Sequence, residues 1–164
     1  MDAVKARSNG AATADCYSNE GMVKVFSRTV TVQTNERTEL VNLSDQVRAF
    51  ADETGIRDGY IKVSSLHTTA GLFINEWQDA LLNDIKMMVD RVVPRESYYY
   101  HNDPEYSDCD RHNADSHLKN VVFGLTLSVP VDQGKLVLGR WQSVILAEFD
   151  GPNERKVFLQ AFGI

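Results

Sequence analysis

The sequence has little cysteine, no long hydrophobic run and no basic segment. Its two cysteines, Cys16 and Cys109, lie far apart, and neither belongs to a paired metal-binding motif. A disulfide framework is therefore not expected, and a reduced, cytoplasmic protein is the default reading. No segment approaches the length of a membrane span, and the first twenty residues are too polar for a secretory signal peptide.

Positive charge is also scarce. The formal net charge is −6, from 17 Lys and Arg against 23 Asp and Glu. A nucleic-acid surface needs a basic patch, and no run of lysines and arginines supplies one. We therefore expect neither nucleic acid nor a membrane among the partners. The 164 residues are 43% hydrophobic and 24% charged, which suits one soluble-type domain with its own core.

Hydrophobic periodicity divides the chain into a leader and one domain. Residues 1–20 are small and polar without periodicity, which predicts a flexible leader before a single domain at 21–164. Alternating apolar residues predict a first strand over 22–34, and the uneven spacing from Val25 to Val30 suggests a bulge near Ser27.

Three segments have apolar residues at helical spacing. The first starts at Asn42 or Ser44 and stops at Gly55, the second covers 77–93, and the third is a short helix closed by Gly124. Four apolar runs with short turns follow, and they predict neighbouring antiparallel strands. Because strands outnumber helices and do not alternate with them, the expected class is α+β, with a mainly antiparallel sheet and about three helices.

Histidines gather in one irregular stretch. His101, His112 and His117 lie there, and His67 ends a predicted strand. Three imidazoles and an open position make a catalytic zinc site, so His67, His101 and His117 are candidate ligands if the fold brings them together. The alternative is hydrogen-bonded structural histidines, because no HExxH motif constrains the spacing. Charged neighbours indicate that His112 is solvated.

The predicted strand over residues 140–149 carries a second polar group. Gln142 and Glu148 share one face of it, with apolar residues between them. A carboxylate in such surroundings is a candidate general acid or base. The alternative is a glutamate at the exposed end of the strand, paired with Arg155 or a lysine. Glu76 has a comparable alternative, since a negative charge also suits the start of the following helix.

Four motifs, in the order HTTAGLFINE, NADSHLK, GRWQ and EFDGPNERKV, resemble the YjbQ family, whose members are commonly labelled secondary thiamine-phosphate synthases. The resemblance spans about residues 22–163. It implies a compact α+β subunit that assembles as a homotrimer, with sites near the subunit boundaries. It also implies a divalent metal ion on His67, His101 and His117, with zinc first and magnesium or manganese as alternatives.

The same resemblance places further residues in motif positions. We expect Glu148, Glu76 and Gln142 to be catalytic. The expected substrate-binding residues are Thr68, Thr69, Asn75, Asn113, Arg155 and Trp141. In this hypothesis the threonines contact an anionic ligand or orient His67, and Asn75 and Glu76 return to the same rim of the pocket. The alternative is that both threonines bond only to backbone groups.

The expected function follows from the family label. It is a metal-assisted enzyme acting on phosphorylated small molecules, which joins a pyrimidine diphosphate to a thiazole phosphate and releases pyrophosphate. Such chemistry calls for cations near the phosphates. Two alternatives remain open: a metal-dependent phosphatase or hydrolase with Glu148 as base, and a non-catalytic ligand-binding trimer.

Overall fold

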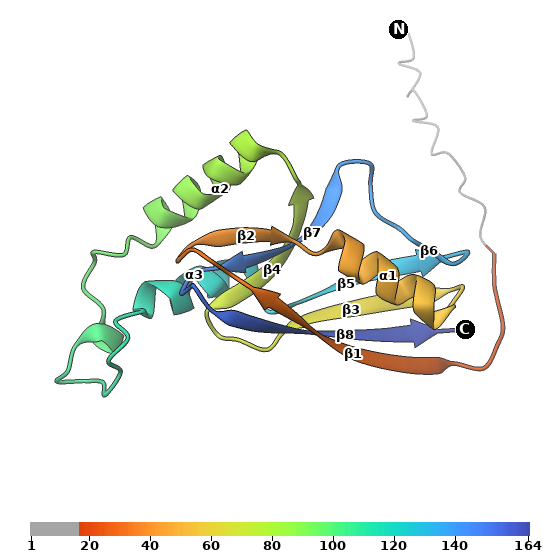
Figure 1. Cartoon of the computed structure of the whole chain (residues 1–164), viewed down its shortest axis with the longest axis horizontal. Helices are drawn as coiled ribbons and strands as arrows, with labels where there is room; N and C mark the ends of the chain where they lie inside the picture. Colours follow the sequence, from red (N-terminus) through yellow and green to blue (C-terminus); the bar gives the residue numbers. More distant parts are fainter. Residues whose placement is uncertain (1–16) are drawn as a thin grey trace, which may run out of the picture.

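Two antiparallel sheets form the framework of the molecule (Figure 1). The computed structural model describes residues 17–164, so most of the predicted leader, with Cys16, lies outside the described residues. The strands are β1 (Lys24–Gln33), β2 (Glu39–Asn42), β3 (Gly59–Ser65), β4 (Ala70–Glu76), β5 (Thr126–Asp132), β6 (Lys135–Leu136), β7 (Gln142–Glu148) and β8 (Glu154–Gly163).

Three α-helices accompany the sheets, as the periodicity predicts. They are α1 (Ser44–Thr54), α2 (Asp79–Val92) and α3 (Ala114–Phe123), and a short 3-10 helix, η1 (Tyr100–Asn102), precedes α3. Gly55 ends α1 with a φ of 64°, in the left-handed region that glycine adopts without strain. The single domain with mainly antiparallel sheets and three α-helices confirms the predicted α+β class.

The order of the strands differs from the sequence expectation. The five-stranded sheet runs β1-β8-β3-β5-β6, and the three-stranded sheet runs β2-β7-β4. Consecutive strands β6, β7 and β8 therefore alternate between sheets, so the prediction that the last four strands are all neighbours is wrong. The predicted bulge near Ser27 is also wrong, because β1 pairs with β8 in one unbroken register from Lys24 to Gln33.

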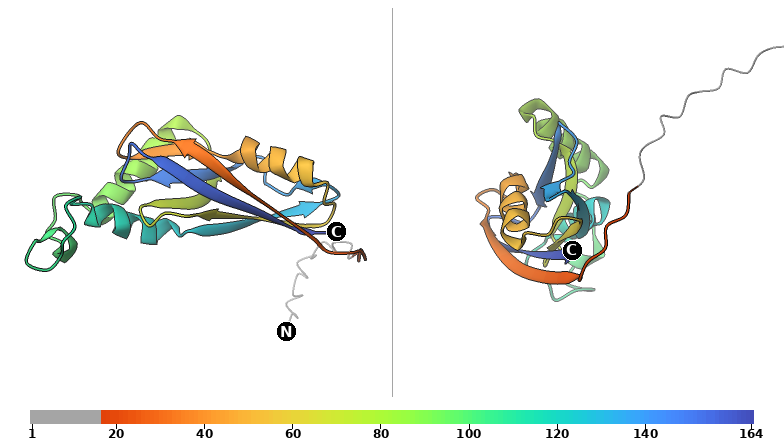
Figure 2. Two further views of the ribbon diagram at one scale, coloured as in Figure 1. Left: turned by 60° about the horizontal axis from the view of Figure 1, so that its bottom comes forward. Right: turned by 90° about the vertical axis from the view of Figure 1, so that its right-hand side faces the viewer.

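The three-stranded sheet is buried on both faces. One face, with Leu72, Val144 and Leu146, packs with α1 and the five-stranded sheet in the main core. Figure 2 shows β1 and β8 curving beneath α1 on this side. The other face packs Ala147 and Phe149 against Ile85 and Val89 of α2. Burial on both sides explains the continuous apolar run of β7, which is typical of an inner strand.

The helices are short and amphipathic. None of those in residues 17–164 is both long and apolar enough to cross a bilayer.

Candidate functional site

The connection from β3 to β4 carries the first candidate residues. The Ser65 hydroxyl donates to the Ala70 carbonyl at 2.6 Å and so closes a tight loop over residues 66–69. This loop runs beside the start of β8, where the Leu66 amide donates to the Lys156 carbonyl at 3.1 Å. The Lys156 amide in turn donates to Nε2 of His67 at 2.7 Å. The His67 ring is thereby held against the start of β8, at one end of the five-stranded sheet.

The irregular segment between α2 and α3 brings two more histidines to the same place. Tyrosine rings at 98, 100 and 106 pack edge to face along it, at centroid distances of 5.4 and 5.0 Å. The Asn102 side chain accepts from the Ala114 amide at 3.0 Å and joins η1 to the start of α3. His101 on η1 and His117 on α3 consequently lie edge to face, with ring centres 5.1 Å apart.

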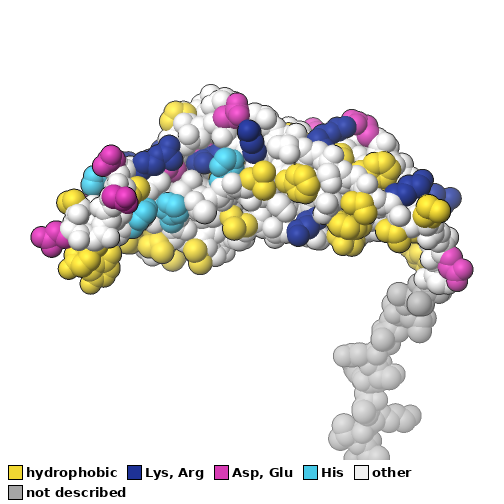
Figure 3. Space-filling model, turned by 90° about the horizontal axis from the view of Figure 1, so that it is seen from below, with side chains coloured by type: hydrophobic (Ala, Val, Ile, Leu, Met, Phe, Trp, Pro, Cys, Tyr) yellow, Lys and Arg dark blue, Asp and Glu magenta, His cyan; other side chains and the backbone are white. Residues whose placement is uncertain are grey.

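These elements enclose one polar pocket of about 370 Å³, which is within the range of small-molecule sites. The view from below shows the histidines toward one end of the molecule, with some basic side chains beside them and others further along the same face (Figure 3). Seven of the twelve predicted site residues line the pocket, namely His67, Thr68, Thr69, His101, Asn113, His117 and Arg155. Leu66, Cys109 and Arg111 complete the lining.

The surroundings favour neutral imidazoles. Burial lowers the pKa of His67, and the positive charges of Arg155 and Lys156 lower it further, against an opposing effect of Glu148. Burial likewise lowers the pKa of His117, and the neighbouring His101 adds to this effect. Both rings are therefore neutral at pH 7, the form in which an imidazole binds metal or accepts a proton.

Of the three histidines predicted to bind a metal ion, only His101 and His117 lie against each other. Two imidazoles on one tetrahedral zinc ion have ring centres about 5 Å apart, given Zn–N distances of about 2.0–2.1 Å, and the His101–His117 spacing agrees with this value. His67 shares the pocket, but its Nε2 lone pair is engaged by the Lys156 amide. Within residues 17–164, no three His, Cys, Asp or Glu side chains are arranged to hold a metal ion.

A buried ion pair forms the floor of the pocket. Glu148 has no exposed surface, and Arg155 is 4% exposed. Nε and Nη2 of Arg155 both bond to Glu148, and Nη2 also donates to the Thr69 hydroxyl at 3.0 Å. Glu148 further accepts from the Thr34 hydroxyl and from the Asp150 amide. The expected pairing with Arg155 is correct, whereas an exposed position for Glu148 is wrong.

This bonding limits what each partner can do. Each oxygen of Glu148 has two donors, so the carboxylate orients Arg155 and has little capacity left to carry a proton. Nη1 of Arg155 has no hydrogen-bond partner in the described part of the chain. Because Arg155 lines the pocket, Nη1 is available to an anionic ligand. Thr69 is buried by its bond to this guanidinium, and Thr68 is exposed at the rim.

A chain of alternating charges extends from Asn113 into the protein. The Asn113 amide donates to Asp150 at 2.7 Å, and Arg37 bonds to both Asp150 and Asp115. Asp115 in turn pairs with Lys119, which also bonds to Asp90 on α2. Asp115 is fully buried and Lys119 is 3% exposed. The lysine therefore serves the packing of α2 on α3 and is not free to bind an anion.

Four of the predicted site residues lie elsewhere. Asn75 and Glu76 end β4, and Glu76 pairs with Gln142 at the start of β7, whereas Ala70 pairs with Glu148 at the opposite end. Seven residues at about 3.3 Å each separate the two ends by about 20 Å. The expectation that Asn75 and Glu76 return to the rim of the histidine pocket is wrong within one subunit. Trp141 accompanies them, 62% exposed, with the Arg140 guanidinium over its ring.

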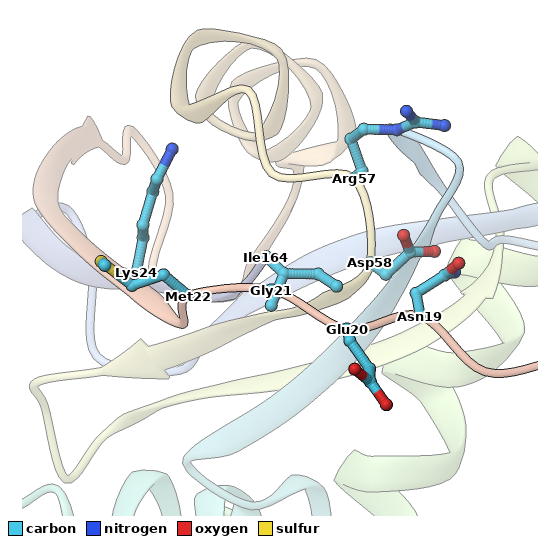
Figure 4. A pocket seen from close by; sticks show the side chains of 8 residues that line it. All are labelled: Asn19, Glu20, Gly21, Met22, Lys24, Arg57, Asp58 and Ile164. Carbon is cyan, nitrogen blue, oxygen red and sulfur yellow. The ribbon is translucent and has the colours of Figure 1, made fainter.

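Two further hollows differ in their relation to the candidate site, since one adjoins it and the other lies past the far end of β8. An apolar groove of about 440 Å³ shares His101 and His117 with the pocket and is otherwise lined by Tyr98, Tyr99, Tyr100, Ala114 and Leu118. A separate hollow lies beside the last residue of the domain, where residues 19–22 pass Arg57, Asp58 and Ile164 (Figure 4). It contains no histidine and none of the predicted site residues, so we do not connect it with the chemistry of the pocket.

The family of the chain follows from comparison with known proteins. Residues 28–164 match the family described as UPF0047 protein YjbQ-like. The chain belongs to the YjbQ family. A UPF0047 protein from Methanothermobacter thermautotrophicus is 37% identical over 141 residues, which cover 86% of this chain and 94% of that protein. The UPF0047 protein YugU of Bacillus subtilis is 34% identical over 140 residues, covering 83% and 98%.

Solved structures of related proteins have the same fold. A YbjQ-like protein of unknown function from Sulfolobus solfataricus superposes with a TM-score of 0.82 at 32% identity, over 87% of this chain and all of that one. A hypothetical protein from Aeropyrum pernix gives a TM-score of 0.78 at 30% identity, over 85% and 99%.

Three polar residues of the pocket and its floor escaped the sequence reasoning. In the sequence, Arg111 is only one of the charged neighbours that indicate a solvent-exposed His112, and Cys109 is part of a polar loop. Asp150 lies inside the motif EFDGPNERKV but is not singled out by it. One signal could have identified Arg111, namely its place in the chain between His101 and His117. If both histidines line one pocket, the loop that joins them lies beside the same pocket.

Proposed function

We propose that this YjbQ-family protein is a metal-assisted enzyme acting on phosphorylated small molecules, in the manner of a secondary thiamine-phosphate synthase. One observation carries the proposal: neutral imidazoles and two guanidinium groups, Arg111 and Arg155, meet in one small pocket. Guanidinium groups suit phosphate oxygens, and neutral imidazoles suit a metal ion or a proton in transit.

The histidine pair is the part of the site that fits a metal. His101 and His117 would hold a divalent ion, and zinc is favoured over magnesium or manganese because those ions prefer oxygen ligands. A bound zinc ion supplies a Lewis acid beside the phosphate and lowers the pKa of water bound to it.

The chain's own residues have distinct tasks in the proposal. Arg155, held by Glu148, directs Nη1 toward the phosphate, and Arg111, which is 63% exposed and pairs with Asp150 at 3.5 Å, adds a second positive charge at the rim. Thr68 offers a hydroxyl beside them. Glu148 is thus a positioning residue for Arg155. The apolar groove next to the histidine pair accommodates the heterocyclic part of a substrate, since its tyrosine and leucine side chains suit a flat ring.

Assembly and location belong to the same proposal. Exposed apolar side chains lie on α2 at Met87, Met88 and Val92, and on α3 at Leu118, Val121 and Val122. Such surfaces typically mark protein contacts. Together with the family resemblance, they support a homo-oligomer, which we propose to be a homotrimer. The free thiol of Cys109 supports a reducing, cytoplasmic location.

Two measurements test the function. Metal analysis of the purified full-length protein should give about one zinc ion per chain. Coupling of a pyrimidine diphosphate to a thiazole phosphate should then be assayed beside phosphatase activity, in wild type and His117→Ala. We expect the variant to lose at least about tenfold in the favoured reaction, as the removal of a metal ligand or proton carrier does.

His112→Asn is the matched control. It removes a histidine of the same segment that is solvent-exposed, and asparagine tolerates the left-handed φ of 49° at this position. Full activity of His117→Ala in both assays contradicts the site. Phosphatase activity without coupling favours the hydrolase alternative. Ligand binding without metal or turnover favours the non-catalytic trimer.

A further inference from the structure

His67 makes a contact that determines which of its nitrogens carries the proton. The Lys156 backbone amide donates to Nε2 of His67 at 2.7 Å. A backbone amide is always a donor, so Nε2 must present a lone pair to it. In a neutral imidazole the other nitrogen, Nδ1, then holds the hydrogen. Nδ1 has no hydrogen-bond partner within residues 17–164.

The contact is part of the fold rather than an incidental side-chain position. The neighbouring Leu66 amide donates to the Lys156 carbonyl, so the loop after β3 continues alongside β8 by one backbone bond and one imidazole bond. The His67 amide also points to the Ser65 hydroxyl at 3.4 Å, within the loop that Ser65 closes. Turning the ring to free Nε2 for a metal would leave the Lys156 amide without its acceptor.

The electrostatic setting is wrong for a cation ligand at this position. Arg155 and Lys156 are the charged groups that act on His67 with the same sign, and Glu148, the one opposing charge, is saturated by its own donors. The same positive charges favour an anion. They also keep the ring neutral, because they disfavour a second proton on it.

We infer that His67 is a hydrogen-bond donor, through Nδ1–H, to an oxyanion such as a phosphate bound in the pocket, and not a metal ligand. His67 then completes a set of donors with Nη1 of Arg155 and the Thr68 hydroxyl, all of which line the pocket. The two groups of residues lie on different elements. The loop after β3 and the start of β8 bind the anion, whereas η1 and α3 provide the His101–His117 pair. The inference rests on the proposed binding of phosphorylated ligands.

Two substitutions separate the nitrogens of the ring. His67→Gln places an amide oxygen near the position of Nε2, where it accepts from the Lys156 amide, but it removes the donor at Nδ1. His67→Asn places an amide donor near Nδ1 and removes the acceptor. Binding of inorganic phosphate and of Zn²⁺ should be measured by calorimetry for the full-length wild type, both variants, and His117→Gln.

We expect His67→Gln to weaken phosphate binding about tenfold and to leave the zinc dissociation constant within about threefold of the wild-type value. His67→Asn should keep more phosphate affinity than His67→Gln. His117→Gln should lose zinc. Equal loss of zinc in His67→Gln and His117→Gln overturns the inference, as does unchanged phosphate binding in His67→Gln while the wild type binds phosphate normally.

Nitrogen-15 correlation spectra of the wild-type imidazoles provide a readout that does not depend on a folded variant. A proton on Nδ1 of His67, unchanged when zinc is added, supports the inference, whereas a proton on Nε2 or a zinc-induced shift overturns it. If the wild-type protein binds phosphate but no zinc, the metal is no longer part of the proposed function. The phosphate measurements then decide the role of His67. Protein that binds neither overturns both.

Discussion

The two ends of the three-stranded sheet carry equally strong sequence motifs, yet they differ in almost every physical respect. At one end, Glu148 and Arg155 form a buried pair beneath the histidine pocket. At the other end, Glu76 and Gln142 face each other across two strands, with Trp141 largely exposed. A functional motif can therefore be completed within its own chain or left open to solvent and to other molecules. The following variants test whether that difference in burial is also a difference in energy.

The largest effect on stability is expected from Glu148, and Glu76 at the other end of the sheet is its control. Glu148→Gln leaves the Arg155 charge buried without its partner, so it should lower the free energy of unfolding by about 3–5 kcal/mol. Glu76→Gln should change it by less than about 0.5 kcal/mol, since the Glu76 carboxylate has no ion pair or hydrogen bond within residues 17–164. Urea unfolding monitored by circular dichroism measures both. Equal losses would remove the energetic distinction between the ends.

The double variant Glu148→Gln with Arg155→Met gives a control for the same pair. Removing both charges eliminates the unpaired guanidinium, so the double variant should be less destabilised than Glu148→Gln alone. A double variant that loses the sum of both single losses would show that packing, rather than the charge, dominates at this end.

Glycines allow a smaller test of the same comparison. A Cβ on Gly71, near the pocket end, would lie 2.6 Å from Asn120 Oδ1 and 2.9 Å from Phe123 Cβ, so α3 would have to move. Gly71→Ala should cost about 1–3 kcal/mol through overpacking. A Cβ on Gly139, at the other end, would meet only the flexible Gln142 side chain at 3.2 Å. Gly139→Ala should be nearly neutral in thermal unfolding, and a reversed ranking would contradict the packing described for α3.

The pH dependence of stability should come from the pocket end. The folded-state pKa values of His67 and His117 are lowered from the ordinary value of 6.5. Their contribution is therefore present in full above about pH 6.5, where neither state binds the proton. It is lost as the pH falls, because the unfolded chain takes up protons first. His117→Gln should flatten the decline in unfolding free energy between pH 7.5 and 5.5, and His112→Asn should not.

The smallest effect is expected at Trp141. Its ring is 62% exposed, and its main contact is the Arg140 guanidinium, 4.8 Å from the ring centre. A cation–π contact at an exposed site contributes about 0.5–1 kcal/mol, so Trp141→Ala should lower stability by less than about 1 kcal/mol. Light scattering should be recorded with the unfolding curves. A larger loss, together with a change in oligomeric state, would show that this end is covered by a partner subunit.

Local features of the fold were predictable, and the pairing of distant segments was not. Apolar spacing and the cap at Gly55 sufficed for the helices because a helix is decided by residues within one or two turns. The insertion of β7 between β2 and β4 depends on contacts across the whole chain. The turns before and after β7 look like hairpins in sequence, but each carries the chain from one sheet to the other.

The site divides in the same way. His101, Asn113 and His117 were predictable as neighbours because one short segment carries them, and the family motifs supplied His67 and Arg155. The predicted position of Glu76 at the pocket was wrong. Alternation along β4 indicates which face a residue occupies, but it does not indicate how far along the strand the pocket lies. The tautomer of His67 depends on the backbone amide of Lys156. The position of a backbone amide cannot be predicted from a pattern of side chains.

The alternating charges that lead from Asn113 to Asp90 restrict how this family of sequences can change. Arg37, Asp115 and Lys119 each neutralise two neighbours at once, so reversing any one of them sets like charges against each other at or next to the fully buried position of Asp115. Viable descendants must replace several of these residues together or none of them. The charges beneath the pocket therefore constrain one another as a single unit.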